Sequence, residues 1–294
     1  MASNSVYTPV GIKNIFFVTD FSPVSRLAMP YAIALASRYK SKVTLVHALG
    51  AVPFTPIPYE QVPPLEQRPR ELVLPQMEAL KKECIANGLE VHIALKDGDL
   101  SDVLDSELLK SDSELVVLGT HAHGGFHRVL MGSHAEHIAR HSRCGVLMVG
   151  PNATGAARWR DRIARILIAT NFEKGSHHAL DYIVPIATEQ RSEVTVLHVV
   201  DELVGVPLDA AELEEHASKQ RLLDLVGHTQ LASLPRIEVR LGHPHQEIIS
   251  LANSLEPDLI VLGRRKGGFF AEHKPSTTLA LVTAQARCPV LTLS

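Results

Sequence analysis

Residues 15–21 have the sequence IFFVTDF, and residues 166–172 have the related sequence ILIATNF. The offset of 151 residues holds without a gap for about thirty positions, through VTLVH at 43–47 and VTVLH at 194–198. Self-similarity over such a length is the sign of a repeated structural unit.

Farther along the chain the offset becomes 144 residues, because the second copy is seven residues shorter in its middle. Gly98 then matches Gly242, and LVVLG at 115–119 matches LIVLG at 259–263. Chance matches do not keep register in this way. We therefore conclude that the chain consists of two copies of one module.

Each copy alternates strands with helices. Residues 15–19 form a continuous apolar run, which is typical of a strand buried on both faces of a sheet. Ser22-Pro23 favours a helix start, because serine caps the first turn and proline suits the first helical position. In the first copy we expect strands at 15–19, 42–48, 90–95, 115–119 and 146–149, and helices at 22–39, 102–109 and 133–141. Helical crossovers imply parallel strands. The expected fold is α/β: two tandem, open-twisted, parallel five-stranded sheets with helices on both faces, a Rossmann-like arrangement.

The organisation along the chain follows from the repeat. We expect one domain at residues 1–150, a linker rich in Asn, Thr, Gly and Ala at 151–160, and a second domain at 161–294. Residues 50–75 carry seven prolines and are expected to form a long loop. This loop either covers a ligand or a partner surface, or extends into solvent.

The composition limits the function classes. Of 294 residues, 45% are hydrophobic and 21% are charged, as in soluble globular proteins. No apolar stretch approaches the roughly 20 residues of a membrane span, and the first ten residues lack the pattern of a secretory signal. We therefore expect a cytoplasmic protein without a membrane partner. The net charge of -3 argues against a general nucleic-acid binder.

The three cysteines, Cys84, Cys144 and Cys288, occur without a CxxC pair. This pattern excludes a disulfide framework and an all-cysteine zinc site. Cys144 and Cys288 precede apolar runs, so small buried side chains are the simplest interpretation.

One loop of the first copy carries the residues suited to ligand binding. Sites in parallel sheets lie beyond the carboxyl ends of the strands, where Thr19-Asp20 and the segment from Gly119 to Ser133 should meet. Glycines before a helix N-terminus let backbone amides approach an anion, and a carboxylate such as Asp20 suits a ribose hydroxyl or an adenine amino group. The pattern matches neither a P-loop nor GxGxxG. It indicates either a nucleotide site or a glycine-rich turn that only reverses the chain.

The whole chain resembles a tandem universal stress protein. The similarity rests, in order, on VTDFS at 18–22, LVHA at 45–48, VVLGTHAHGG at 116–125, MGS at 131–133 and CGVLMV at 144–149. The ATP-binding members carry G-x2-G-x9-G followed by Ser or Thr. This chain keeps that spacing, with Ala122 in place of the second glycine, which adds a methyl group where the backbone would approach phosphate.

The resemblance implies an adenine nucleotide alpha hydrolase-like fold and a stress-response regulator or sensor. Its ligand would be ATP, with or without Mg2+, or another adenine nucleotide. The implied contacts are Thr19 and Asp20 at the adenine and ribose, Ala48 at the adenine edge, Gly119, His121 and Ala122 at the ribose and phosphates, and Gly132, Ser133 and the amide of His134 at the phosphates. The resemblance further implies an intrachain pseudo-dimer through residues 146–149 and 290–293, an unidentified protein partner, and association of two such chains.

The second copy departs from this pattern. Asn171 replaces the aspartate, Lys266 and Ser276 stand at the second and third glycine positions, and Thr277 stands at the Ser133 position. Residues 264–266, of sequence RRK, either attract an anion or form a solvated basic turn. We expect one nucleotide per chain, in the first copy, and a structural or partner-binding role for the second.

Histidines offer further candidates. Six lie between His121 and His141, and His134, His137 and His141 can share one helix face. A metal site there would need another ligand, and beyond Glu136 none stands at a diagnostic spacing, so a solvated or interface face is favoured. His47 and His198 occupy matching strand ends, which indicates a shared structural hydrogen bond.

Dedicated catalysis finds no support, because no nucleophile, base and orienting group can be assembled. We expect at most a weak hydrolysis of bound ATP. Two alternatives remain beside the nucleotide-binding regulator: a nucleotide-free interaction or scaffold protein on the same fold, and an enzyme that transfers or hydrolyses phosphate groups.

Overall fold

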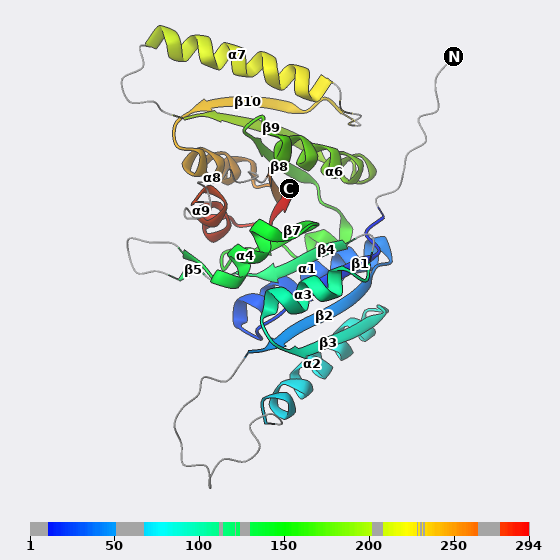
Figure 1. Ribbon diagram of the computed structural model, residues 1–294. Helices are drawn as coiled ribbons and strands as arrows, with labels where there is room; N and C mark the ends of the chain where they lie inside the picture. The colour runs from blue at the N-terminus through cyan, green and yellow to red at the C-terminus, as the bar shows by residue number, and fades with distance from the viewer. Residues whose placement is uncertain are drawn as a thin grey trace, which may run out of the picture.

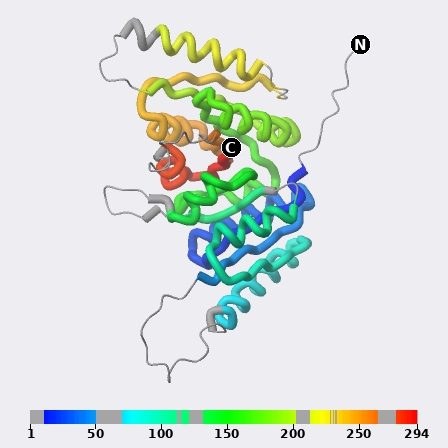
Figure 2. The backbone as a smooth tube through the Cα atoms, in the orientation of Figure 1, coloured from blue at the N-terminus to red at the C-terminus, as the bar shows by residue number. Residues whose placement is uncertain are grey.

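The computed structural model describes residues 11–50, 68–111, 114–120, 122–123, 130–201, 208–227, 229, 231, 233–263 and 277–293. The two halves of the chain stack end to end, with the first half at one end of the molecule and the second half at the other (Figure 1 and Figure 2). This arrangement follows from a single sheet that passes through both halves.

The sheet has ten strands in the order β10-β9-β8-β11-β12-β7-β4-β1-β2-β3 (Figure 1). The first half contributes β1 (Asn14–Val18), β2 (Lys42–Leu49), β3 (Val91–Asp97), β4 (Glu114–Gly119) and β7 (Gly145–Val149). The second half contributes β8 (Arg165–Thr170), β9 (Glu193–Val200), β10 (Arg236–Leu241), β11 (Leu259–Gly263) and β12 (Val290–Leu293). Within each half the five strands pair in parallel, which confirms the expected α/β fold.

The halves join where β7 and β12 pair antiparallel, with Met148 opposite Val290 and Val146 opposite Thr292. The expected contact between the terminal strands is therefore present. It merges the two five-stranded sheets into one, and all three residues of β12 in this pairing are buried.

Helices cover both faces. On one face lie α1 (Pro23–Tyr39), α2 (Arg68–Ala86), α6 (Lys174–Gln190) and α7 (Leu208–Gly227), and on the other lie α3 (Leu100–Leu108), α4 (Ser133–His141), α8 (Pro244–Leu255) and α9 (Thr277–Gln285). Neighbouring strand residues serve opposite layers: Phe17 packs into the first layer and Phe16 into the second. Each layer runs without a break across both halves of the chain.

The expectation of a proline-rich loop over residues 50–75 is wrong for its last part. Helix α2 begins at Arg68 and contains both Pro69 and Pro75. Pro69 stands in the first turn, where its missing N–H is not needed, but Pro75 removes one intrahelical hydrogen bond. Packing against the sheet offsets that loss, because Met77, Leu80 and Cys84 of α2 are buried. Residues 51–67 lie outside the described residues.

The segment predicted as a linker makes specific contacts. It includes the short helix α5 (Arg158–Asp161), and Trp159 is only 3% exposed. The Trp159 ring meets the Tyr31 ring edge to face at 5.1 Å, and its indole N–H donates to the Asp258 carbonyl at 3.2 Å. Because Tyr31 belongs to the first half and Asp258 to the second, Trp159 ties the halves together.

Among the described residues, no helix combines the length and the apolar character that crossing a membrane would require. All three cysteines are free thiols. Cys288 is buried as expected, whereas Cys144 is only half-buried, with its sulfur 3.2 Å from the Ser142 hydroxyl.

Removing the Trp159 side chain should loosen the contact between the halves. We expect Trp159→Ala to lower the free energy of unfolding by about 3–5 kcal/mol, because it leaves a large cavity. Trp159→Phe keeps most of the packing and loses the hydrogen bond, so it should cost only about 1–2 kcal/mol. Urea denaturation followed by circular dichroism measures both, and equal losses in the two variants would contradict the packing role.

Candidate functional site

The candidate site lies where the chain order reverses within the first half. Strand β1 lies between β2 and β4, with Val18 opposite Val46 on one side and Leu118 on the other. Helix α1 follows β1 onto one face, whereas α4 follows β4 onto the opposite face. The segments after β1 and β4 therefore diverge at the carboxyl edge of the sheet, the usual ligand position in such folds.

Thr19 holds the turn that follows β1. Its N–H donates to the Val46 carbonyl at 3.1 Å, and its carbonyl accepts from the His47 ring at 2.7 Å. Its hydroxyl accepts from the Phe21 amide at 3.0 Å and pairs with the Ser25 hydroxyl at 2.9 Å. Thr19 is 4% exposed, so its side chain supports the turn from inside the protein.

The same turn places Asp20 on the surface. Asp20 is exposed, and its carboxylate accepts from the Ser22 amide at 3.0 Å. Phe21 adopts a left-handed backbone with φ of 61°, which is uncommon for a residue other than glycine. Its ring packs against His47 at 4.8 Å. This strained geometry fixes the direction in which Asp20 projects.

The second half builds the same turn with different chemistry. Phe172 also has φ of 61°, its ring lies 4.3 Å from His198, and His198 contacts the Thr170 carbonyl at 2.8 Å. The structural hydrogen bond predicted for both histidines is confirmed. Asn171, however, accepts from the Ser176 hydroxyl at 2.7 Å and from the Glu173 amide at 3.1 Å. Its amide oxygen thus helps to close the start of α6.

Gly119 ends β4 and is required by packing. A methyl group at this position would overlap the Val24 carbonyl and lie 2.6 Å from the Ser25 Cα. Gly263, its counterpart, meets the backbone of Gly175 and Ser176 in the same way. The glycine at the first position of the motif is therefore a requirement of the scaffold in both halves.

Beyond Gly119 the loop forms a small hairpin. Strand β5 (Ala122–His123) pairs antiparallel with β6 (Leu130–Met131), and Ala122 stands opposite Met131. The predicted contact residue His121 and residues 124–129 lie outside the described residues. This pair of strands connects the end of β4 to the start of α4. Gly132 directly follows β6 and is the capping residue of α4.

Gly132 caps α4 without any side-chain hydrogen bond to the first turn. Its φ of -55° suits any residue, and a methyl group built on it would meet no atom of the described residues within 4 Å. The fold itself therefore does not demand glycine here. Ser133 and His134, the first residues of α4, are exposed, and the N–H groups at a helix start favour an anion.

Asp99 is a neighbour of this helix start that the sequence pattern did not reveal. It caps α3, and a hydrogen bond from the Ser101 amide lowers the pKa of its carboxyl, with a further lowering from the charge of nearby His134. The only sequence sign was its place as a capping residue after Gly98. The starts of α3 and α4 thus lie at the same edge of the sheet.

The structure brings Asp20, Ala48, Gly119, Gly132, Ser133 and His134 to this one edge through the ends of β1, β2 and β4 and the start of α4. Ala48 is half-buried and pairs with Lys96 of β3. The counterpart loop of the second half, residues 264–276, including Lys266 and Ser276, lies outside the described residues, and Thr277 begins α9.

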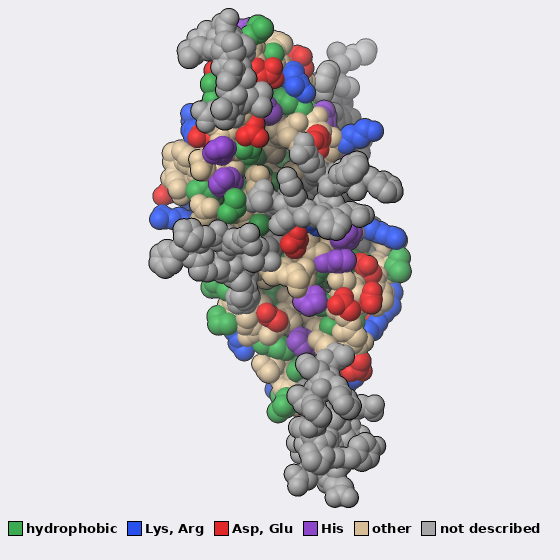
Figure 3. Space-filling model, turned by 60° about the vertical axis from the view of Figure 1, so that its left-hand side comes forward, with side chains coloured by type: hydrophobic (Ala, Val, Ile, Leu, Met, Phe, Trp, Pro, Cys, Tyr) green, Lys and Arg blue, Asp and Glu red, His purple; other side chains and the backbone are tan. Residues whose placement is uncertain are grey.

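Two of the three α4 histidines lie together. The rings of His137 and His141 are 4.3 Å apart, and the His141 ring contacts the His137 carbonyl at 3.0 Å. In the part of the chain that the structure describes, no group of three His, Cys, Asp or Glu residues is placed to hold a metal. On the face shown in Figure 3, histidines mix with acidic and basic side chains, and the described Lys and Arg form no single large patch.

Known proteins resemble this chain in sequence and structure. The sequence model of the universal stress protein family matches residues 11–150 and 162–294. A universal stress protein of Mycobacterium tuberculosis is 23% identical over 283 residues, which cover 92% of this chain and 93% of that protein. One from Methanocaldococcus jannaschii is 27% identical over 141 residues, covering 47% of this chain and 81% of the relative. The crystal structure of a universal stress protein from Archaeoglobus fulgidus superposes with a TM-score of 0.72 at 16% identity and covers 97% of both chains.

The two glycines of the candidate loop should respond differently to substitution. We expect Gly119→Ala to destabilise the protein by about 2–3 kcal/mol, because the methyl group collides with the backbone of α1. Gly132→Ala should cost no more than about 1 kcal/mol, the difference between glycine and alanine at a helix cap. Thermal and urea unfolding of both variants provide the measurement. A Gly132→Ala variant as unstable as Gly119→Ala would show that the fold demands glycine at both positions.

Proposed function

The chain belongs to the universal stress protein family, and from this premise we propose that its first half binds ATP or another adenine nucleotide. In this proposal the tandem protein acts in the cytoplasm as a stress-response regulator or sensor. The bound nucleotide changes its conformation or its choice of protein partner, and the second half binds no nucleotide.

Gly132 is the observation that carries the proposal. Among the described residues, none comes within 4 Å of a methyl group built on its Cα, its backbone is ordinary, and the start of α4 has no side-chain cap. Glycine at such a position is explained by a ligand that approaches the backbone closely, as phosphate does at helix starts. Ser133 adds a hydroxyl donor at the same place.

The difference between Asp20 and Asn171 supports binding in the first half alone. A carboxylate accepts hydrogen bonds from ribose hydroxyls or an adenine amino group more strongly than a neutral amide does. Both side chains accept a hydrogen bond from their own turn, Asp20 from the Ser22 amide and Asn171 from the Glu173 amide, but only Asp20 is a carboxylate. Thr19, whose polar groups are hydrogen-bonded to strand β2, to the turn and to Ser25, would position Asp20 and contact the nucleotide little.

A route by which the nucleotide could affect the second half also exists. Strand β6, in the loop that ends at Gly132, lies beside α9 of the second half. Helix α9 in turn packs on α8. A shift of the loop on phosphate binding would therefore be transmitted through α9 to α8. A sensor needs such a connection between its ligand site and a second site.

The alternative is a nucleotide-free interaction or scaffold protein on the same fold. Its support is Ala122, whose methyl group stands at a position where the ATP-binding pattern has glycine, and the altered second loop. The two functions differ in one property: a nucleotide that binds the folded chain raises its melting temperature, and one that does not bind leaves it unchanged.

Isothermal titration of the purified chain with ATP tests the proposal. We expect measurable binding to the wild type, and Asp20→Asn and Gly132→Val should each weaken it at least about tenfold, through loss of a charge-assisted hydrogen bond and through steric exclusion of phosphate. Asn171→Ala, at the matching position of the second half, serves as the control and should bind like the wild type.

Circular dichroism and the melting temperature of each variant confirm that it is folded. Heats equal to dilution for the wild type, with a melting temperature that ATP does not change, would overturn the nucleotide site and favour the scaffold alternative. Binding that Asn171→Ala weakens more than Asp20→Asn would place the ligand in the second half, against the proposal.

A further inference from the structure

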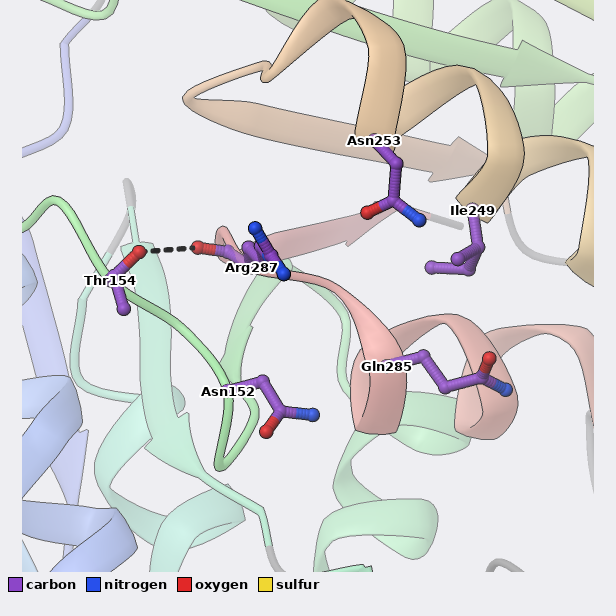
Figure 4. A pocket seen from close by; sticks show the side chains of 6 residues that line it. All are labelled: Asn152, Thr154, Ile249, Asn253, Gln285 and Arg287. Carbon is purple, nitrogen blue, oxygen red and sulfur yellow. Dashed lines mark hydrogen bonds between the residues drawn. The ribbon is translucent and has the colours of Figure 1, made fainter.

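An open polar cavity of about 550 Å³ lies at the surface, between the segment that joins the two halves and the second half (Figure 4), and all of its lining residues except Ile249 are exposed. Its wall is formed by Asn152, Thr154, Ile249, Asn253, Gln285 and Arg287. None of the residues proposed to bind the nucleotide lines it. The volume falls in the range of pockets that bind small metabolites, about 300–1,000 Å³.

Hydrogen bonds of the joining segment hold one wall of the cavity in place. The Thr154 amide donates to the Arg287 carbonyl at 2.8 Å, and the Asn152 side chain donates to the Ala284 carbonyl at 2.8 Å. The Thr154 hydroxyl also donates to the Arg287 carbonyl at 3.4 Å (Figure 4). The Thr154 carbonyl accepts from the Tyr31 hydroxyl of the first half at 2.7 Å. The wall is therefore preorganised by contacts with both halves.

Arg287 gives the cavity its charge. Arg287 is exposed, its guanidinium forms no hydrogen bond or ion pair with another described residue, and the lining includes no carboxylate. Figure 4 shows it between Asn253 and the joining segment. An arginine fork without a carboxylate partner favours a ligand phosphate or carboxylate, to which it donates two hydrogen bonds.

The rest of the lining suits hydroxyl groups. The side-chain amides of Asn253 and Gln285 both donate and accept, which matches ligand hydroxyls that also do both, and the Thr154 hydroxyl, which donates to the Arg287 carbonyl, keeps its oxygen as an acceptor. Ile249 supplies one apolar contact. We propose that this cavity binds a small polyhydroxylated molecule with one anionic group, such as a sugar phosphate or a sugar acid, independently of the nucleotide.

The first half does not keep the residues that line the cavity. Arg143 matches Arg287 at the offset of 144 residues, but Leu109 stands at the Asn253 position and Asp105 at the Ile249 position. The joining segment, which closes one side, occurs once in the chain. Arg143 therefore provides a matched control that has the same local sequence, Arg-Cys, without the other lining groups.

Isothermal titration with glucose 6-phosphate and with gluconate tests the proposal and separates a phosphate from a carboxylate ligand. At least one of them should bind, and Arg287→Gln should weaken that binding at least about tenfold. Arg143→Gln should leave it unchanged. Asn253→Leu, which installs the residue of the first half, should weaken glucose 6-phosphate or gluconate while leaving inorganic phosphate unaffected.

Binding of neither ligand at millimolar concentration would overturn the proposal, and so would binding that Arg287→Gln does not change. Inorganic phosphate that binds as tightly as glucose 6-phosphate would remove the role of the hydroxyl-binding groups and with it the proposed ligand class. Asp20→Asn should not alter the titration. Sugar-phosphate binding that Asp20→Asn abolishes and ATP competes for would assign the ligand to the nucleotide site and overturn the separate cavity site.

Discussion

Antiparallel pairing of β7 with β12 determines how every other part of the molecule is arranged. It turns two five-stranded parallel sheets into one and keeps equivalent helices on the same face, so that each buried layer is continuous across the halves. It also reverses the strand direction from one half to the other, which places the carboxyl edges of the two halves at opposite edges of the sheet. Gly150, after β7, lets the Thr283 backbone of α9 approach closely, since any side chain there would collide with it. The halves therefore cannot share one nucleotide site, and each must be judged by its own residues.

Comparing the two halves distinguishes the residues that the fold requires from the residues that a ligand would require. Features that both halves keep are explained by folding: the left-handed phenylalanine, the histidine that contacts the threonine carbonyl, and the glycine against the first helix. Features that only the first half keeps have no such explanation. Asp20 and Gly132 belong to this second group, because Asn171 closes the same turn without a carboxylate and the described residues leave room for a side chain at Gly132. A duplicated chain thus offers an internal comparison that a single-domain protein lacks.

Much of the fold could be predicted because buried strands appear in the sequence as apolar runs and the duplication appears as a repeat. The five strands of each half and the start of α4 follow from apolar runs and capping residues. Three features could not be predicted, because each depends on tertiary contacts. Helix α2 tolerates Pro75 through burial of its other face, Trp159 turns an apparent linker into an interface, and the polar cavity is assembled from three distant segments. The structure adds packing roles for two of the predicted site residues, and whether the predicted residues bind a nucleotide stays a prediction. Gly119 proved to be a packing glycine, and Thr19 an internal support of the turn.

The central claim is that the two halves share a scaffold but only the first retains a nucleotide site. Native mass spectrometry of the intact chain with excess ATP counts the bound nucleotides directly. One nucleotide per chain, lost in Gly132→Val and retained in Asn171→Ala, is the predicted result. Two nucleotides per chain, or one that persists in Gly132→Val, would contradict the claim.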